Sequence, residues 1–330
     1  MARNYSTPTI LALLFSVCSV GWAFQSAETL VSIVPRSRPM PADAVPNFPE
    51  PNLRVAASLV QIPVHVTTAS GSSVTTLRED NFRLFEDGIE QKISHFALDD
   101  APVSIGLLFD VSGSMQNKMR QAIEASAAFF KTANAEDEFF LIEFSERPKL
   151  VVPLTSDSDE VYQRIVHARP FGRTALLDAI HMAMNQMKSA RNLRKAIVIL
   201  SDGGDNRSRY TEREIKNALL ESDVQVYAMG IFDREEQRKR TPEEQNGPKL
   251  LDYLAEQTGG HSYPVDNLEE LPVISARIGN ELRNQYLLGY TPSNEERDGK
   301  YRRVKVSLTA PDGMVNLRTY YRLGYHSPTQ

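Results

Sequence analysis

The chain has 330 residues, of which 41% are apolar, and its formal net charge at pH 7 is −5. This length suits about two domains, and the apolar fraction is sufficient for an ordinary buried core. Because the chain carries no broad basic field, its composition argues against a protein that binds nucleic acid or is held on anionic lipid by charge.

The N-terminus predicts an exported protein. Arg3 precedes an apolar run over 10–20, and Gly21 and Ala23 are small residues at the usual spacing for cleavage. We therefore predict a signal peptide over 1–23 and a periplasmic or extracellular mature protein. An uncleaved anchor is the alternative, although a run of about 11 residues is short for crossing a bilayer. No second apolar run of spanning length follows it.

Two features of the remaining chain limit how it is held together. Cys18 is the only cysteine and lies in the predicted signal, so the mature chain would have no disulfide and no thiol chemistry. Residues 24–52 are rich in proline, which lacks the backbone donor that helices and strand ladders need. We predict an extended linker there.

Two strand-forming segments flank the middle of the chain. Residues 53–100 include alternating, β-branched sequence and an Asp87-Gly88 turn signal, and residues 284–330 contain three strand-like stretches, the last being VNLRTYYRLGY. Neither segment has enough strands to bury a good core alone. We predict that they pair into one small β module; two separate appendages are the alternative.

The segment between them, 101–283, predicts an α/β domain. Apolar runs such as VSIGLLF, FFLIEF, KAIVILS and VQVYAMGI alternate with stretches of helical period. This alternation is typical of a doubly wound, mostly parallel sheet covered by helices. The predicted fold is therefore an α/β domain inserted in a small β module built from N- and C-terminal strands.

Oxygen-bearing side chains follow two of these strands and open one helix. Asp110, Ser112 and Ser114 come after VSIGLLF, Asp202 comes directly after KAIVILS, and Thr174 begins a helix. Ligands of doubly wound sheets bind beyond the carboxyl ends of the strands, so these side chains are expected to meet. Two carboxylates and three hydroxyls suit Mg²⁺ or Mn²⁺ rather than zinc. With so few charged ligands the metal would stay positive, and an outside carboxylate could complete its shell.

Each of these residues also has an ordinary structural explanation. An aspartate or threonine often caps a helix, and serine is common in turns. Two further aspartates near the site are left out of the predicted ligands, because Asp205 is expected to cap a loop and Asp178 to favour the dipole of its helix.

The three parts together resemble the metal-ion-dependent adhesion site of von Willebrand factor type A (VWA) domains. The family pattern is D-x-S-x-S, then a threonine and then an aspartate in later loops, and DVSGS, GRTALLDA and SDG match it in order over about 101–283. The resemblance implies that Ser112, Ser114 and Thr174 contact the metal directly or through water. It also implies that Asp110 and Asp202 act mostly through water, and that the partner is a protein offering Asp or Glu. The flanking segments are similar, more loosely, to VWA-related proteins of acidobacteria.

Signals of catalysis are weak. The six histidines are scattered without zinc spacing, and the chain has no G-x-S-x-G elbow, phosphate-binding loop or GxGxxG. A phosphoaspartate enzyme usually carries a second aspartate where this chain has Ser112. We predict a non-enzymatic adhesion or binding protein. The alternatives are a structural subunit of an envelope or surface assembly, in which metal only stabilises the fold, and a secreted hydrolase.

Overall fold

The computed structural model describes residues 59–231, 246–311 and 313–329. The predicted signal peptide (1–23) and linker (24–52) lie outside these residues and stay predictions. The described strands are β1 (Val60–Thr67), β2 (Phe82–Glu86), β3 (Ile89–Gln91), β4 (Ile93–Asp99), β5 (Val103–Asp110), β6 (Glu138–Phe144), β7 (Pro148–Thr155), β8 (Arg194–Ser201), β9 (Val224–Ile231), β10 (Ser262–Val265), β11 (Gln285–Tyr290), β12 (Tyr301–Leu308), β13 (Arg318–Tyr321) and β14 (Gly324–His326). The α-helices are α1 (Met119–Phe130), α2 (Ser158–Val166), α3 (Leu176–Met187), α4 (Glu212–Leu220), α7 (Gly247–Thr258) and α8 (Leu271–Arg283), with short 3-10 helices at 79–81, 113–115 and 268–270.

The central sheet has six strands in the order β10-β9-β8-β5-β6-β7. All neighbours are parallel except β6 and β7, which pair antiparallel at one edge. Every residue of β5 is buried, as the unbroken apolar run predicts. Gly106 in this strand leaves room for a neighbour, because a Cβ there would lie 2.2 Å from the ring of Phe140 on β6.

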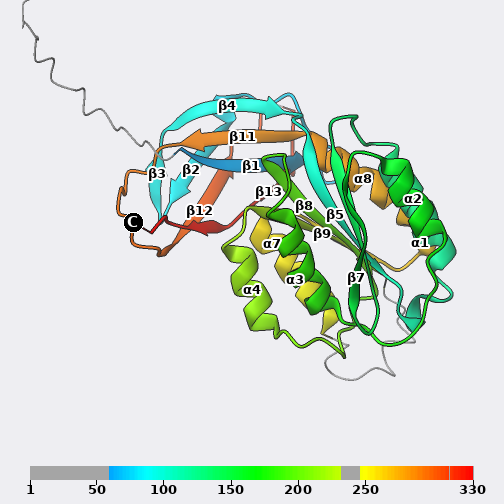
Figure 1. The fold of residues 1–330 in the computed structure, drawn as a ribbon. Helices are drawn as coiled ribbons and strands as arrows, with labels where there is room; N and C mark the ends of the chain where they lie inside the picture. The colour runs from blue at the N-terminus through cyan, green and yellow to red at the C-terminus, as the bar shows by residue number, and fades with distance from the viewer. Residues whose placement is uncertain (1–58, 232–245, 312, 330) are drawn as a thin grey trace, which may run out of the picture. The chain divides into compact units, whose positions relative to one another are not determined.

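Helices cover both faces of this sheet (Figure 1). Side chains of α1, α2 and α8 share one apolar cluster with Ile105, Leu107 and Phe109 of β5. Leu108 points to the other face, where it joins a second cluster with α3, α4 and α7. The alternation along β5 divides the core into two layers, which confirms the predicted doubly wound α/β fold.

The strands before and after this domain form two antiparallel sheets, β13-β1-β11-β4 and β14-β12-β2-β3. In the first, Val64 of β1 pairs with Tyr286 of β11 on one side and with Tyr321 of β13 on the other. Both sheets contribute to one apolar cluster, which includes Leu84 and Val306. The prediction that the two terminal segments pair is therefore confirmed, although the proposed domain boundaries stay predictions.

The prediction of one last strand over VNLRTYYRLGY is wrong. The stretch forms β13, which pairs with β1, and β14, which pairs with β12 in the other sheet. Arg322 and Leu323 carry the chain from one sheet to the other. The predicted turn at Asp87-Gly88 is confirmed, since both residues have positive φ, 47° and 85°, as a two-residue hairpin turn requires.

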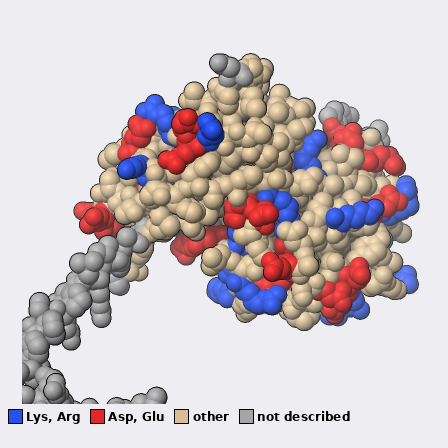
Figure 2. All heavy atoms as spheres, turned by 90° about the horizontal axis from the view of Figure 1, so that it is seen from above, with Lys and Arg blue, Asp and Glu red and all other residues tan. Residues whose placement is uncertain are grey.

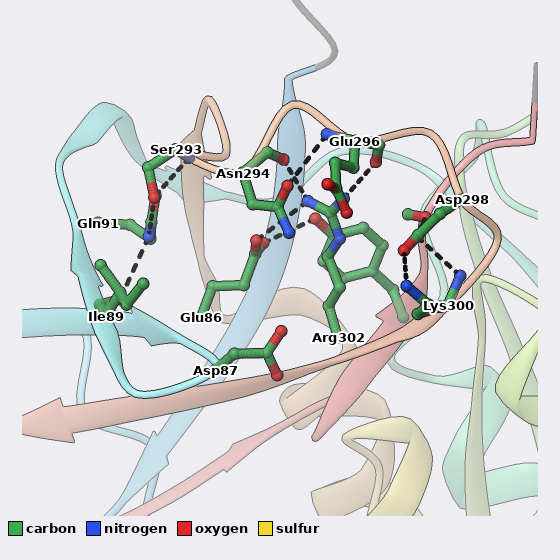
Figure 3. Close-up of polar contacts among 12 residues, drawn as sticks. Glu86, Asp87, Ile89, Gln91, Ser293, Asn294, Glu296, Asp298, Lys300 and Arg302 are labelled. Atoms are coloured by element: carbon green, nitrogen blue, oxygen red, sulfur yellow. Dashed lines mark hydrogen bonds and ion pairs between the residues drawn. The ribbon is translucent and has the colours of Figure 1, made fainter.

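A buried ion pair fastens the second of these sheets. Arg302 of β12 lies 3.2 Å from Glu86 of β2, and both side chains are almost fully buried. Glu86 also accepts hydrogen bonds of 2.7 Å from the hydroxyls of Tyr290 and Tyr325. Figure 3 shows the Arg302 guanidinium next to the connection between β11 and β12, where it donates to two backbone carbonyls. One charged group thus joins β2, β12 and this connection.

The outer surface carries both signs of charge. The face in Figure 2 shows basic and acidic groups close together, with no area of one sign covering it. Among the described residues, none of the helices is both long and apolar enough to span a membrane.

We expect Arg302→Met to lower the free energy of unfolding by about 3–5 kcal/mol, because it leaves the Glu86 carboxylate buried without its ion-pair partner. Urea denaturation measures the loss. The matched control is Arg303→Met, one residue along the same strand on an exposed side chain, which should change stability by about 0.5 kcal/mol or less. Equal stability of the two variants would contradict the role given to Arg302.

Candidate functional site

The first part of the candidate site is the turn that follows β5. Asp110 ends the strand with no exposed surface, and its Oδ1 accepts a hydrogen bond of 2.8 Å from the Ser112 amide. The hydroxyls of Ser112 and Ser114 lie 3.0 Å apart. Ser112 is buried and Ser114 is exposed, so the turn presents hydroxyl oxygens from the interior to the surface.

The second part follows the neighbouring strand β8. Its last residue, Ser201, donates from its hydroxyl to Asp110 Oδ2 at 2.5 Å, and Asp202 comes next, with 1% of its surface exposed. The Asp202 carboxylate accepts a long hydrogen bond of 3.4 Å from the Gly204 amide. Adjacent parallel strands therefore bring the two carboxylates to the same edge of the sheet.

Backbone hydrogen bonds bind the loop that carries Thr174 to both other parts. The Phe171 amide donates to the Val111 carbonyl at 2.8 Å, and the Gly172 carbonyl accepts from the Gly113 amide at 2.9 Å. Thr174, which is 5% exposed, donates its amide to the side chain of Asn206 at 3.1 Å. The structure thus brings together the three loops that hold all five predicted site residues.

The charges at this edge oppose each other. Burial, followed by the neighbouring charge of Asp202, raises the pKa of Asp110 to about 7, while hydrogen bonds from Ser112 and Ser201 offset part of the rise. The ammonium of Lys118 lies 3.7 Å from Asp202 Oδ2, and both of these side chains are buried. Two buried carboxylates that repel each other favour a nearby cation.

The donor set fits a hard divalent cation. The five side chains offer two carboxylates and three hydroxyls, and oxygen donors of this kind suit Mg²⁺ or Mn²⁺. No group of three or more His, Cys, Asp or Glu side chains suited to a metal occurs in the part of the chain that the structure describes. The candidate site has three hydroxyl donors and two carboxylates, so it would not form a group of three His, Cys, Asp or Glu side chains.

Asp205 and Asp178 serve as structural anchors. Asp205 Oδ2 accepts from the Leu177 amide in the first turn of α3 at 2.8 Å and from the Ser208 hydroxyl at 2.6 Å. Asp178 Oδ1 accepts from the Arg209 amide at 2.8 Å. Both carboxylates therefore tie α3 to the loop that follows Asp202, consistent with their exclusion from the predicted ligands.

Sequence reasoning missed two residues of the site. Ser201 ends an apolar strand and carries no signal of its own, although its hydroxyl contacts Asp110. Lys118 stands in the polar stretch QNKMR, where a lysine is normally exposed, yet only 5% of its surface is accessible.

Residues 105–204 match the family model for the von Willebrand factor type A domain. The chain carries a VWA domain. The matched segment contains β5, α1 and β8, and so all five predicted site residues.

The chain is also similar, at low identity, to individual proteins. An uncharacterized protein of Borreliella burgdorferi is 24% identical over 199 residues, which are 54% of this chain and 57% of that protein. Inter-alpha-trypsin inhibitor heavy chain H2 of Sus scrofa is 28% identical over 155 residues, 42% of this chain but 16% of its own. A solved von Willebrand factor type A structure from Catenulispora acidiphila is 13% identical, with a TM-score of 0.47 and coverage of 74% of this chain and 73% of its own. The chain thus spans less than two thirds of the length of either curated relative.

We expect Asp205→Ala to lower the free energy of unfolding by about 1 kcal/mol, as for a lost helix cap, because the Leu177 amide would lose its acceptor. Affinity for Mg²⁺ should stay within about threefold of the wild type, since an anchor is not a ligand. Thermal denaturation and calorimetric titration measure the two effects, and a complete loss of metal binding with normal stability would make Asp205 a ligand instead.

Proposed function

We propose that the VWA domain binds one divalent cation, Mg²⁺ or Mn²⁺, and uses it to hold an acidic side chain of a partner protein. The proposed ligands are Asp110, Ser112, Ser114, Thr174 and Asp202. The observation that supports this most is the meeting of three oxygen-bearing loops around two buried, mutually repelling carboxylates. When bound, the cation would supply a positive centre for a carboxylate oxygen.

The residues of the chain have separate parts in this proposal. The buried carboxylates supply the negative charge, and the hydrogen bond from Ser201 keeps Asp110 oriented. Ser114, which is exposed, is the donor nearest to an incoming partner. The backbone bonds between the three loops hold the donors in place before any ligand arrives, which lowers the entropy lost on binding.

The surface next to the site favours an acidic partner. Arg173 precedes Thr174, and Arg207 follows Asn206. Thr174 and Asn206 hydrogen-bond to each other, so the two arginines lie on neighbouring loops. Both arginines are exposed, and neither forms an ion pair with any other residue that the structure describes. Phe171, with 61% of its surface exposed, adds an apolar contact beside them. Complementary charge at such a rim speeds association and selects partners.

Other parts of the proposal rest on the sequence. Export to the periplasm or the exterior rests on the predicted signal peptide, and the lack of enzymatic activity rests on the VWA domain and on the absence of catalytic motifs. A structural subunit of an envelope assembly is the second candidate. Loss of metal would abolish partner binding under the main proposal, whereas it would lower only stability under the second.

We expect calorimetric titration of the metal-stripped mature protein with Mg²⁺ or Mn²⁺ to show one binding site. Ser112→Ala/Ser114→Ala should weaken the affinity at least tenfold, because two of the three hydroxyl donors are lost. This pair of changes leaves no buried charge without its partner, unlike Asp110→Ala or Asp202→Ala. The control is Ser189→Ala, an exposed serine just after α3. A wild type that binds neither metal would contradict the proposal.

Acidic peptides test the second half of the proposal. Metal-loaded protein should bind peptides rich in Asp or Glu more tightly than matched Asn or Gln peptides, and a chelator should abolish the difference. Arg173→Glu/Arg207→Glu should weaken this binding several-fold while metal affinity stays within about threefold, since exposed rim charges act on association. Arg303→Glu, an exposed change on β12, is the control. Equal binding of acidic and amide peptides would count against a carboxylate-accepting site.

A further inference from the structure

Lys118 is a buried cation at the edge of the candidate site. It lies immediately before α1, between the D-x-S-x-S turn and the helix, and 5% of its surface is exposed. Its Nζ is 3.7 Å from Asp202 Oδ2, and the two side chains are 6% and 1% exposed. A lysine is rarely buried to this extent unless it is paired with a negative charge.

The two carboxylates of the site have different neighbours. Asp110 is held by the Ser112 amide and the Ser201 hydroxyl, both neutral donors. Asp202 faces the ammonium of Lys118 as well as its own loop. At a separation of about 4 Å in a partly buried setting, opposite charges attract strongly. The pair therefore offsets part of the repulsion between Asp202 and Asp110.

We propose that Lys118 is a built-in cation that stabilises the metal-free site by pairing with Asp202, and that it makes the metal-loaded site one unit of charge more positive than it would otherwise be. With both carboxylates ionised, the charges of Asp110, Asp202 and Lys118 sum to one negative unit, which a divalent cation turns into one positive unit. Without Lys118 the same sum would be one unit lower. The lysine therefore lowers affinity for metal and raises affinity for an acidic partner. The metal-loaded half of this proposal rests on the proposed function, whereas the metal-free half does not.

The test replaces Lys118 by methionine, which keeps most of the aliphatic stem and removes the charge. The control is Lys131→Met, the same change on an exposed side chain at the other end of α1. Thermal unfolding in EDTA and calorimetric titration with Mg²⁺ and Mn²⁺ are measured for both variants and the wild type.

We expect Lys118→Met to unfold several degrees lower than the wild type in EDTA and to bind Mg²⁺ at least tenfold more tightly, while Lys131→Met matches the wild type in both. Saturating Mg²⁺ should restore most of the lost unfolding temperature, because the metal takes over the charge of the lysine. A Kd for Mg²⁺ within twofold of the wild type, together with an unchanged unfolding temperature in EDTA, would overturn the proposal.

A second variant separates charge from packing if Lys118→Met folds poorly. Adding Asp202→Asn removes the carboxylate that Lys118 neutralises, so Lys118→Met/Asp202→Asn should be more stable in EDTA than Lys118→Met alone. If the lysine acted only by filling space, Asp202→Asn would change the stability in EDTA by the same amount with and without Lys118, and the proposal would fail.

The two proposals fail in different ways. A wild type that binds neither metal contradicts the proposed function, while the comparison in EDTA still decides whether Lys118 stabilises the site. A wild type that binds Mg²⁺ normally, with Lys118→Met showing the same Kd and the same stability in EDTA, contradicts the role of Lys118 and leaves the metal site in place.

Discussion

The parallel pairing of β5 with β8 is the constraint on which the candidate site depends. The register aligns Phe109 with Leu200, so the next residues of the two strands, Asp110 and Ser201, also lie side by side. Their hydrogen bond of 2.5 Å joins the two loops at the sheet edge. Asp202 follows directly, so the same register that packs the apolar core also forces two carboxylates into a buried position.

The free-energy cost of burying two carboxylates explains why hydrogen-bond donors and an ammonium surround them. Buried charges are unfavourable unless they are paired or hydrogen-bonded. Amide and hydroxyl donors reach Asp110, and the ammonium of Lys118 reaches Asp202. Burial, and after it the remaining repulsion by Asp202, raises the pKa of Asp110, and a divalent cation would relieve that repulsion. Under the proposed function, metal affinity and metal-free stability would both follow from this one charge arrangement.

The β module also contains buried charges, but there they are paired with each other and lie away from any open site. Glu86 and Arg302 are both buried, and the hydroxyls of Tyr290 and Tyr325 complete the partners of the carboxylate. Burial raises the pKa of Tyr290, which keeps its hydroxyl protonated as a donor. The module is therefore closed around its charges, whereas the edge of the α/β sheet carries the exposed Ser114 and the exposed Arg173 and Arg207.

Patterns that depend on neighbouring residues were predictable from the sequence. The apolar runs predicted the buried strands, and the placement of Asp110, Ser112, Ser114, Thr174 and Asp202 after or before regular elements predicted that their loops would meet. Features that depend on distant contacts were not predictable. The burial of Lys118 results from its packing beside the loop after β8, and the division of the last strand results from two sheets that each bind part of it. Whether metal occupies the predicted ligands is likewise decided by three-dimensional geometry and not by spacing.

The most direct measurement of the central claim is a crystal structure of the protein grown with Mn²⁺, with anomalous diffraction recorded at the manganese absorption edge. The account predicts one anomalous peak among Ser112, Ser114 and Thr174, with hydroxyl oxygens at about 2 Å, the distance typical of small divalent cations. A fully occupied peak elsewhere, or an empty site at saturating Mn²⁺, would contradict it.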